Sequence, residues 1–105
     1  MILDTNALSA FADGDEGLAA ELEKSPELFL PVVVLGEFRF GVRQSRHRRT
    51  YEKWLDEALA ELEVLPVFDS TTVYYAALWQ ELKQSGTPIP TNDAWIAALC
   101  REHRM

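Results

Sequence analysis

The chain has 105 residues, of which 48% are hydrophobic, with a single cysteine (Cys100) and a formal net charge of −7 at pH 7. This length predicts one domain, and a lone cysteine excludes an intramolecular disulfide, which fits a protein of the reducing cytoplasm. No apolar run reaches the roughly 18 residues that a membrane helix needs. The excess of acids argues against a general nucleic-acid binder, because phosphate contacts require lysine and arginine.

The first half of the chain predicts strands and helices in alternation. Residues 1–3 are a short apolar run that predicts a buried strand with its carboxyl end at Asp4. Gly14 separates two helical stretches, and Pro31 suits the start of a third helix because its missing N–H costs nothing there. The expected elements are a strand at 1–3, helices at 5–12 and 16–24, a strand at 28–30 and a helix at 32–44.

The second half continues this alternation. The apolar residues between Tyr51 and Leu62 follow the i, i+3, i+4, i+7 pattern of an amphipathic helix, with acids on its opposite face. Asp69 is placed to cap a further helix, which Gly86 ends. Either residue of the pair 91–92 can cap the last helix. The expected elements are a helix at 51–62, a strand at 64–67 and helices at 71–84 and 94–103.

Strands separated by helices predict parallel pairing, and therefore a three-layer α/β domain in which helices flank a short parallel sheet. Functional sites in such sheets form beyond the carboxyl ends of the strands. Asp4 lies at such an end, Glu37 in the helix after the second strand, and Asp93 at the start of the last helix. Carboxylates are ligands that Mg²⁺ and Mn²⁺ prefer, so we hypothesise a metal site that activates water against a phosphate.

Each of these acids also has an ordinary structural interpretation. Asp4 can cap the helix that follows it, and Asp93 can stabilise a helix N-terminus through the helix dipole. Glu37 lies among apolar neighbours and is either a metal ligand or the partner of Arg39 or Arg43. The residues alone leave both interpretations open.

Positive charge is concentrated in one segment of this acidic chain. The segment contains Arg43, Arg46, Arg48 and Arg49, with His47 among them. It is either an RNA-contacting patch or a solvated junction between two helices.

Three short motifs follow one another along nearly the whole chain. They are Ile2-Leu3-Asp4-Thr5-Asn6, then Val33-Val34-Leu35-Gly36-Glu37-Phe38 followed by Gly41, then Pro90-Thr91-Asn92-Asp93-Ala94-Trp95-Ile96-Ala97-Ala98. Together they resemble the motifs of PIN-domain ribonucleases, and the third is most like that of VapC toxins. The resemblance implies that Asp4, Glu37 and Asp93 are catalytic, metal-binding acids supported by Asn6. It also implies Mg²⁺- or Mn²⁺-dependent cleavage of RNA, a homodimer and a cognate antitoxin that obstructs the site.

The resemblance is incomplete at the C-terminus. Family members continue past the last helix into a fourth strand and a further aspartate, whereas this sequence stops at Met105. We therefore expect a C-terminally shortened single domain over residues 1–105, with an incomplete set of acids and an unpaired edge on the first strand. Two hypotheses follow: an active ribonuclease toxin, or a catalytically impaired toxin remnant that acts as an antitoxin-binding or dimerisation module.

Overall fold

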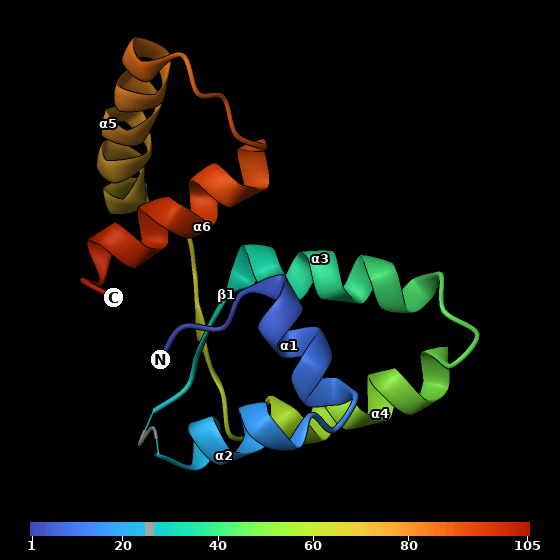
Figure 1. The fold of residues 1–105 in the computed structure, drawn as a ribbon. Helices are drawn as coiled ribbons and strands as arrows, with labels where there is room; N and C mark the ends of the chain where they lie inside the picture. The colour runs from blue at the N-terminus through green and yellow to red at the C-terminus, as the bar shows by residue number, and fades with distance from the viewer. Residues whose placement is uncertain (25–26) are drawn as a thin grey trace.

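The computed structural model describes residues 1–24 and 27–105, which form helices around a short parallel sheet (Figure 1). The elements are α1 (Thr5–Ala12), α2 (Glu16–Lys24), β1 (Phe29–Pro31), α3 (Val32–Arg43), α4 (Arg48–Ala58), β2 (Glu63–Leu65), α5 (Asp69–Ser85) and α6 (Thr91–Glu102). This arrangement confirms the predicted α/β class with a short parallel sheet flanked by helices. Within the described ranges, no helix is both long enough and apolar enough to cross a membrane.

The sheet is short, and each of its pairings is parallel. β1 pairs with β2, with Leu30 opposite Val64. Residues 1–3 run along the other edge of β1 and add one bridge, between Ile2 and Phe29. The N–H of Leu3 donates to the Phe29 carbonyl at 2.9 Å. The first predicted strand is therefore in place but reduced to one bridge, and its outer edge is unpaired among the described residues.

The N-terminal body, defined as residues 1–68, is built around one buried apolar cluster. Its buried members are Leu3, Leu8, Leu30, Val34, Phe38, Val42, Leu55 and Leu62. Trp54 of α4 packs edge-on against Phe11 of α1, with ring centroids 5.4 Å apart, and against Phe38 of α3 at 5.8 Å. Burial of each large apolar side chain contributes roughly 1.5–3 kcal/mol, so this cluster fixes α1 against α3 and α4.

The C-terminal hairpin, defined as residues 69–102, consists of α5 and α6. In Figure 1, α5 stands away from the N-terminal body, and α6 is the helix of the pair that contacts α3. Tyr75 of α5 stacks on Trp95 of α6 with ring centroids 3.8 Å apart. Of the two helices, α6 therefore makes the main contact with the body.

Polar contacts join the start of α5 to the end of α6. Thr71 is fully buried, and its hydroxyl donates to Oε1 of Glu102 at 2.6 Å. The Ser70 hydroxyl donates to the second oxygen of the same carboxylate. These hydrogen bonds lower the pKa of Glu102, because they stabilise its charged form. Arg101 adds an ion pair to Glu81 at 2.7 Å.

Several element boundaries match the sequence prediction, and one clear difference has a tertiary cause. α1 and α2 have the predicted bounds, and Gly14 and Gly86 adopt positive φ values of 77° and 67° just beyond helix ends. α4 ends at Ala58 rather than at residue 62. The chain turns there because Leu62 enters the core and Glu63 begins β2.

Two predicted helix caps are wrong. Asp69 is the first residue of α5 rather than its cap. Phe68 takes the cap position, where its N–H donates a hydrogen bond to the Thr71 hydroxyl. α6 begins at Thr91 and follows Pro90, so neither Thr91 nor Asn92 caps it.

Candidate functional site

An open cavity of about 570 Å³ lies where the N-terminal body meets α6. It is lined by Asp4, Thr5, Asn6, Glu37, Asp93, Ile96 and Ala97. All three acids singled out by the sequence line this carboxylate cavity, and so does Asn6. They come from the end of the first extended segment, from α1, from α3 and from α6. The parallel topology therefore brings these residues to one place.

Asp4 has a structural role as well as a place in the cavity. Its backbone is extended (φ −85°, ψ 177°), and its Oδ1 accepts the N–H of Ala7 at 2.7 Å, which caps α1. The capping interpretation of Asp4 is thus confirmed. The second carboxylate oxygen accepts no hydrogen bond among the described residues, so the cap does not use the whole side chain.

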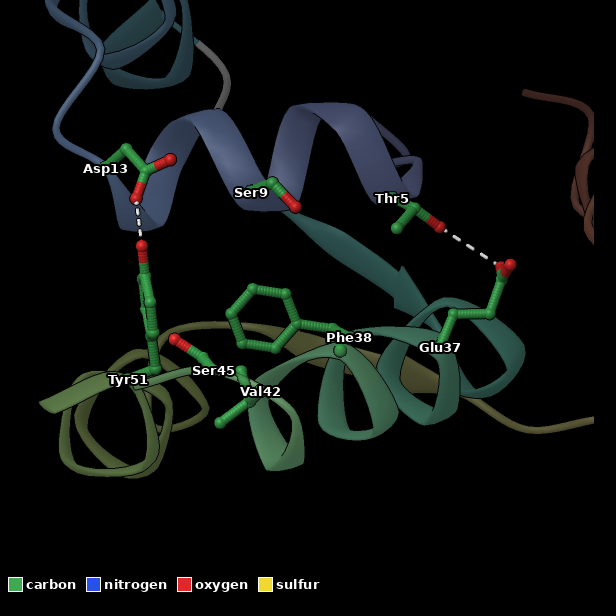
Figure 2. Close-up of a pocket in the computed structure, with 9 residues that line it drawn as sticks. Thr5, Ser9, Asp13, Glu37, Phe38, Val42, Ser45 and Tyr51 are labelled. Carbon is green, nitrogen blue, oxygen red and sulfur yellow. Dashed lines mark hydrogen bonds between the residues drawn. The ribbon is translucent and has the colours of Figure 1, made fainter. Parts of the chain in front are cut away.

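Glu37 is half-buried and is held by a threonine that the sequence analysis did not single out. The Thr5 hydroxyl donates to Oε1 of Glu37 at 3.1 Å, as Figure 2 shows. No ion pair joins Glu37 to Arg39 or Arg43 among the described residues, so the interpretation of Glu37 as an arginine partner is wrong. The one sequence signal for Thr5 is its place directly after Asp4 in the first motif.

Asp93 and Asn6 lie in the first turns of their helices. Asp93 is the third residue of α6 and is exposed, where the partial positive charge of the helix N-terminus favours a carboxylate. Asn6 is the second residue of α1 and is also exposed. Ile96 and Ala97 follow Asp93 by about one turn and complete the cavity wall.

The donor set fits a hard divalent cation in chemistry, but it is not gathered into a ligand shell. Carboxylate oxygens are ligands that Mg²⁺ and Mn²⁺ accept. Nevertheless, no group of three or more carboxylate, imidazole or thiol side chains in the described ranges stands close enough to hold one metal ion. The ligand roles of Asp4, Glu37 and Asp93 stay predictions.

The basic segment begins at the end of the helix that carries Glu37 and continues into α4. Arg43 ends α3, and Arg48 begins α4, where it pairs with Glu52 at 3.1 Å. Arg43, Arg46 and Arg49 are exposed and form no ion pair among the described residues. Arg43 follows Glu37 by six residues, which is about 9 Å along a helix at 1.5 Å per residue.

A second, smaller cavity of about 210 Å³ lies between α1, α3 and α4 (Figure 2). We name it the side cavity. Thr5 and Glu37 line both cavities, so the two adjoin. At its far end, the Tyr51 hydroxyl donates to Oδ1 of Asp13 at 2.7 Å, and this bond together with the charge of Asp13 raises the pKa of Tyr51. This cavity could not be predicted from the sequence, because its walls meet only after α1 crosses the α3–α4 pair.

Comparison with known proteins identifies the family. The sequence matches the family described as PIN domain over residues 1–105. Ribonuclease VapC2 from Rickettsia felis is 32% identical over 101 residues, which cover 92% of this chain and 75% of that protein. Ribonuclease VapC5 from Mycobacterium tuberculosis is 33% identical over 103 residues, which cover 93% of this chain and 73% of that protein.

A solved structure agrees with these sequence matches. The crystal structure of VapBC2 from Rickettsia felis, bound to a DNA fragment from its promoter, contains a chain that superposes with a TM-score of 0.87. That match has 29% sequence identity and covers 94% of this chain and 77% of the other. The chain described here therefore belongs to the PIN domain family. Within that family it is of the VapC toxin type.

Proposed function

We propose that this chain is a metal-dependent endoribonuclease and the toxin of a toxin–antitoxin pair. The observation that carries the proposal is that Asp4, Glu37 and Asp93, three acids far apart in the sequence, line one cavity. Two similar proteins are named ribonucleases, which supports RNA as the substrate class.

Mg²⁺ or Mn²⁺ would be held by Asp4, Glu37 and Asp93. When bound, such an ion supplies a water nucleophile at neutral pH and compensates charge on the phosphate. Asp4 keeps one oxygen on the first turn of α1 and has its second oxygen for a ligand role. The Thr5 hydroxyl restrains Glu37, and we assign Asn6 to the support of Asp4. Restraint of this kind is worth about 10–100-fold in metal affinity or activity in known metal sites.

Arg43, Arg46 and Arg49 are proposed to contact the RNA backbone, with Arg48 adding charge from its pair with Glu52. Unpaired, exposed guanidiniums are suited to phosphate oxygens, and this segment begins about 9 Å along α3 from Glu37. The local positive charge therefore offsets the net acidity of the chain where the substrate would lie.

A cognate antitoxin and a second copy of the chain are the proposed protein partners. The solved neighbour named VapBC2 supports an antitoxin partner. Phe68 and Val73 expose 60% and 68% of their surface at the start of α5, and Tyr74 beside them is also exposed. We assign this apolar surface to the homodimer. RNA and the free thiol of Cys100 are both compatible with action in the cytoplasm.

The test is cleavage of single-stranded and looped RNA by the purified chain in millimolar Mg²⁺ or Mn²⁺. We expect cleavage that Asp4→Asn slows by about 100-fold, the upper end of what disturbing the surroundings of a metal site costs. Asparagine also caps helices well, so this variant should fold. Asp56→Asn is the matched control, because Asp56 is an exposed acid of α4 outside the cavity. Equal cleavage by both variants would rule out the carboxylate cavity as the active site.

A second candidate function is that of an impaired toxin remnant that binds an antitoxin or dimerises without cutting efficiently. The observation that favours it is the lack of a gathered ligand set among the described residues. The same assay separates the candidates when a metal titration is added. An active site predicts that Mg²⁺ or Mn²⁺ raises the melting temperature through binding to the folded chain, whereas a remnant predicts neither this shift nor cleavage.

A further inference from the structure

We propose that the side cavity receives one nucleobase of the RNA, next to the phosphate that is cut, and thereby sets base preference. This inference rests on the proposed ribonuclease function and deepens it. The side cavity shares Thr5 and Glu37 with the carboxylate cavity, so its occupant lies directly beside the proposed site of chemistry.

The size of the side cavity suits a single ring system. Its volume is about 210 Å³, below the roughly 300–1,000 Å³ of pockets that enclose a whole drug-sized ligand. Figure 2 shows it bounded by two hydrogen bonds that span from α1 to its neighbours: Thr5 to Glu37 at one end, and Tyr51 to Asp13 at the other. A base can enter from the shared wall, whereas a folded helix has no room.

The walls offer the two kinds of contact by which proteins recognise unpaired bases. Phe38 and Tyr51 supply aromatic rings, with centroids 6.3 Å apart in an edge-to-face arrangement. Single-stranded RNA is bound by stacking on such rings and by hydrogen bonds to base edges. The Ser9 hydroxyl has no hydrogen-bond partner among the described residues, and Asp13 engages only one oxygen with Tyr51. A carboxylate oxygen accepts from an exocyclic amino group, so the cavity favours cytosine or adenine over uracil.

The charge distribution around the cavity favours a nucleotide over a basic peptide. Asp13 and Glu37 make the interior acidic, which excludes a phosphate but admits a neutral base. Ser45 lines the cavity and lies in sequence between Arg43 and Arg46, which are exposed and unpaired among the described residues. A base inside, with one of its two flanking phosphates at this rim and the other toward the carboxylate cavity, satisfies both charges, whereas a basic peptide meets repulsion at the rim.

Two glycines of α3 provide a matched test. Gly41 lines the side cavity and Gly36 lines neither cavity, and a Cβ added at either meets nothing within 4 Å. Gly41→Leu and Gly36→Leu should therefore both fold, and only the first fills the cavity. The probes are fluorescein-labelled RNA tetramers of cytidine, adenosine and uridine. Binding is measured by anisotropy in an Asp4→Asn background, in which cutting is about 100-fold slower, and without added Mg²⁺ or Mn²⁺.

The parent chain should bind the cytidine and adenosine tetramers more tightly than the uridine tetramer. Gly41→Leu should weaken that binding by about tenfold and erase the preference, within the range expected for losing one base stack. Gly36→Leu should match the parent, and Asp13→Asn should move the preference toward uridine because an amide can donate to its carbonyl. Identical binding by the two leucine variants, or no base preference in the parent, would overturn the base pocket.

Cleavage assays on the same variants with Asp4 restored separate this inference from the proposed function. Cleavage that Gly41→Leu does not alter, with unchanged tetramer binding, would overturn the pocket and leave the ribonuclease in place. If Gly41→Leu weakens tetramer binding but the parent chain cuts no RNA, the base pocket is supported and the proposed nuclease function is wrong. Loss of antitoxin assembly by Gly41→Leu, with RNA binding intact, would reassign the cavity to a protein partner and overturn the proposal.

Discussion

The N-terminal body and the C-terminal hairpin are stabilised by different interactions. The body surrounds one apolar cluster that joins α1, α3, α4 and the sheet. The hairpin buries only Leu78 and Leu99 among its large aliphatic residues, and it adds the Tyr75–Trp95 stack, the Thr71–Glu102 hydrogen bond and the Arg101–Glu81 ion pair. Of the two helices of the hairpin, α6 contacts α3, and its Ile96 borders the apolar cluster of the body.

This difference matters because the candidate site draws on both regions. Asp4 and Glu37 belong to the body, where the Ala7 N–H restrains Asp4 and the Thr5 hydroxyl restrains Glu37. Asp93 and the wall residues Ile96 and Ala97 arrive on the hairpin. The geometry of the carboxylate cavity therefore depends on how firmly α6 sits on the body. The following experiments test that division, from the largest expected effect to the smallest.

The largest effect is expected from truncating a leucine in the body. Leu8 is fully buried in the core, so Leu8→Ala should lower the free energy of unfolding by about 3 kcal/mol, within the range for such cavities. Leu78→Ala in α5 is the matched change in the hairpin, where 6% of the residue is exposed. It should mainly speed hydrogen exchange in α5 and α6. If Leu78→Ala destabilises β1 and α1 as much as Leu8→Ala does, the two regions are one cooperative unit.

Removal of the Thr71 hydroxyl should loosen the hairpin alone. Thr71→Ala leaves the N–H of Phe68 and a carboxylate oxygen of Glu102 without this partner, which costs about 1–3 kcal/mol. Hydrogen exchange should increase in α5 and at the end of α6, with α1 and α3 unchanged. Thr50→Ala, an exposed change on α4, is the control and should stay within about 0.5 kcal/mol of the parent. Uniform loss of protection across the chain would contradict a separate hairpin.

The basic segment of the body should act on RNA affinity without affecting base preference. Arg46→Gln should weaken binding of every RNA sequence alike and reduce the slope of log affinity against log salt by about 1. Lys53→Gln removes one exposed positive charge of α4 outside the segment and serves as the control. If log affinity falls with log salt at the same slope for these two variants, the segment is a solvated helix junction and not an RNA-contacting patch.

The smallest effect is expected from acidification of the hairpin. Hydrogen bonds from Ser70 and Thr71 lower the pKa of Glu102 in the folded chain below the ordinary value of 4.5. These two hydrogen bonds therefore stabilise the folded chain at a pH above 4.5. That stabilisation is lost as the pH falls through the lowered pKa of Glu102. The protection of α5 amides against hydrogen exchange, measured relative to their intrinsic exchange rates, should fall between pH 5 and the acid limit of folding, and Glu102→Gln should weaken this dependence. If the pH dependence is the same in Glu102→Gln, a group other than Glu102 causes the loss of stability in acid.

Local signals in the sequence predicted the elements whose ends are set locally. α1 and α2 have the predicted bounds, because Asp4 caps the first and Gly14 breaks the chain between them. Element ends that depend on tertiary contacts were not predictable. α4 stops early so that Leu62 can enter the core, and the Thr71 hydroxyl displaces Asp69 from the predicted cap.

The candidate site also has features that the sequence predicted and features that depend on tertiary contacts. The convergence of Asp4, Glu37 and Asp93 followed from where parallel strands end, together with the family motifs that contain them. The Thr5 hydrogen bond and the side cavity did not, because Ser9 and Asp13 become cavity walls only when α1 lies against α3 and α4. Whether the chain is a shortened single domain stays a prediction.

The most direct measurement is a double-mutant comparison of RNA cleavage across the two regions. Asp4→Asn removes an acid of the body, Asp93→Asn removes one from the hairpin, and the third variant carries both changes. If the two regions build one active site, each single change should slow cleavage by about 100-fold, and the double variant should be hardly slower, because residues that act as a unit are non-additive. Independent losses that multiply in the double variant, or an Asp93→Asn chain that cuts like the parent, would contradict a site shared between body and hairpin.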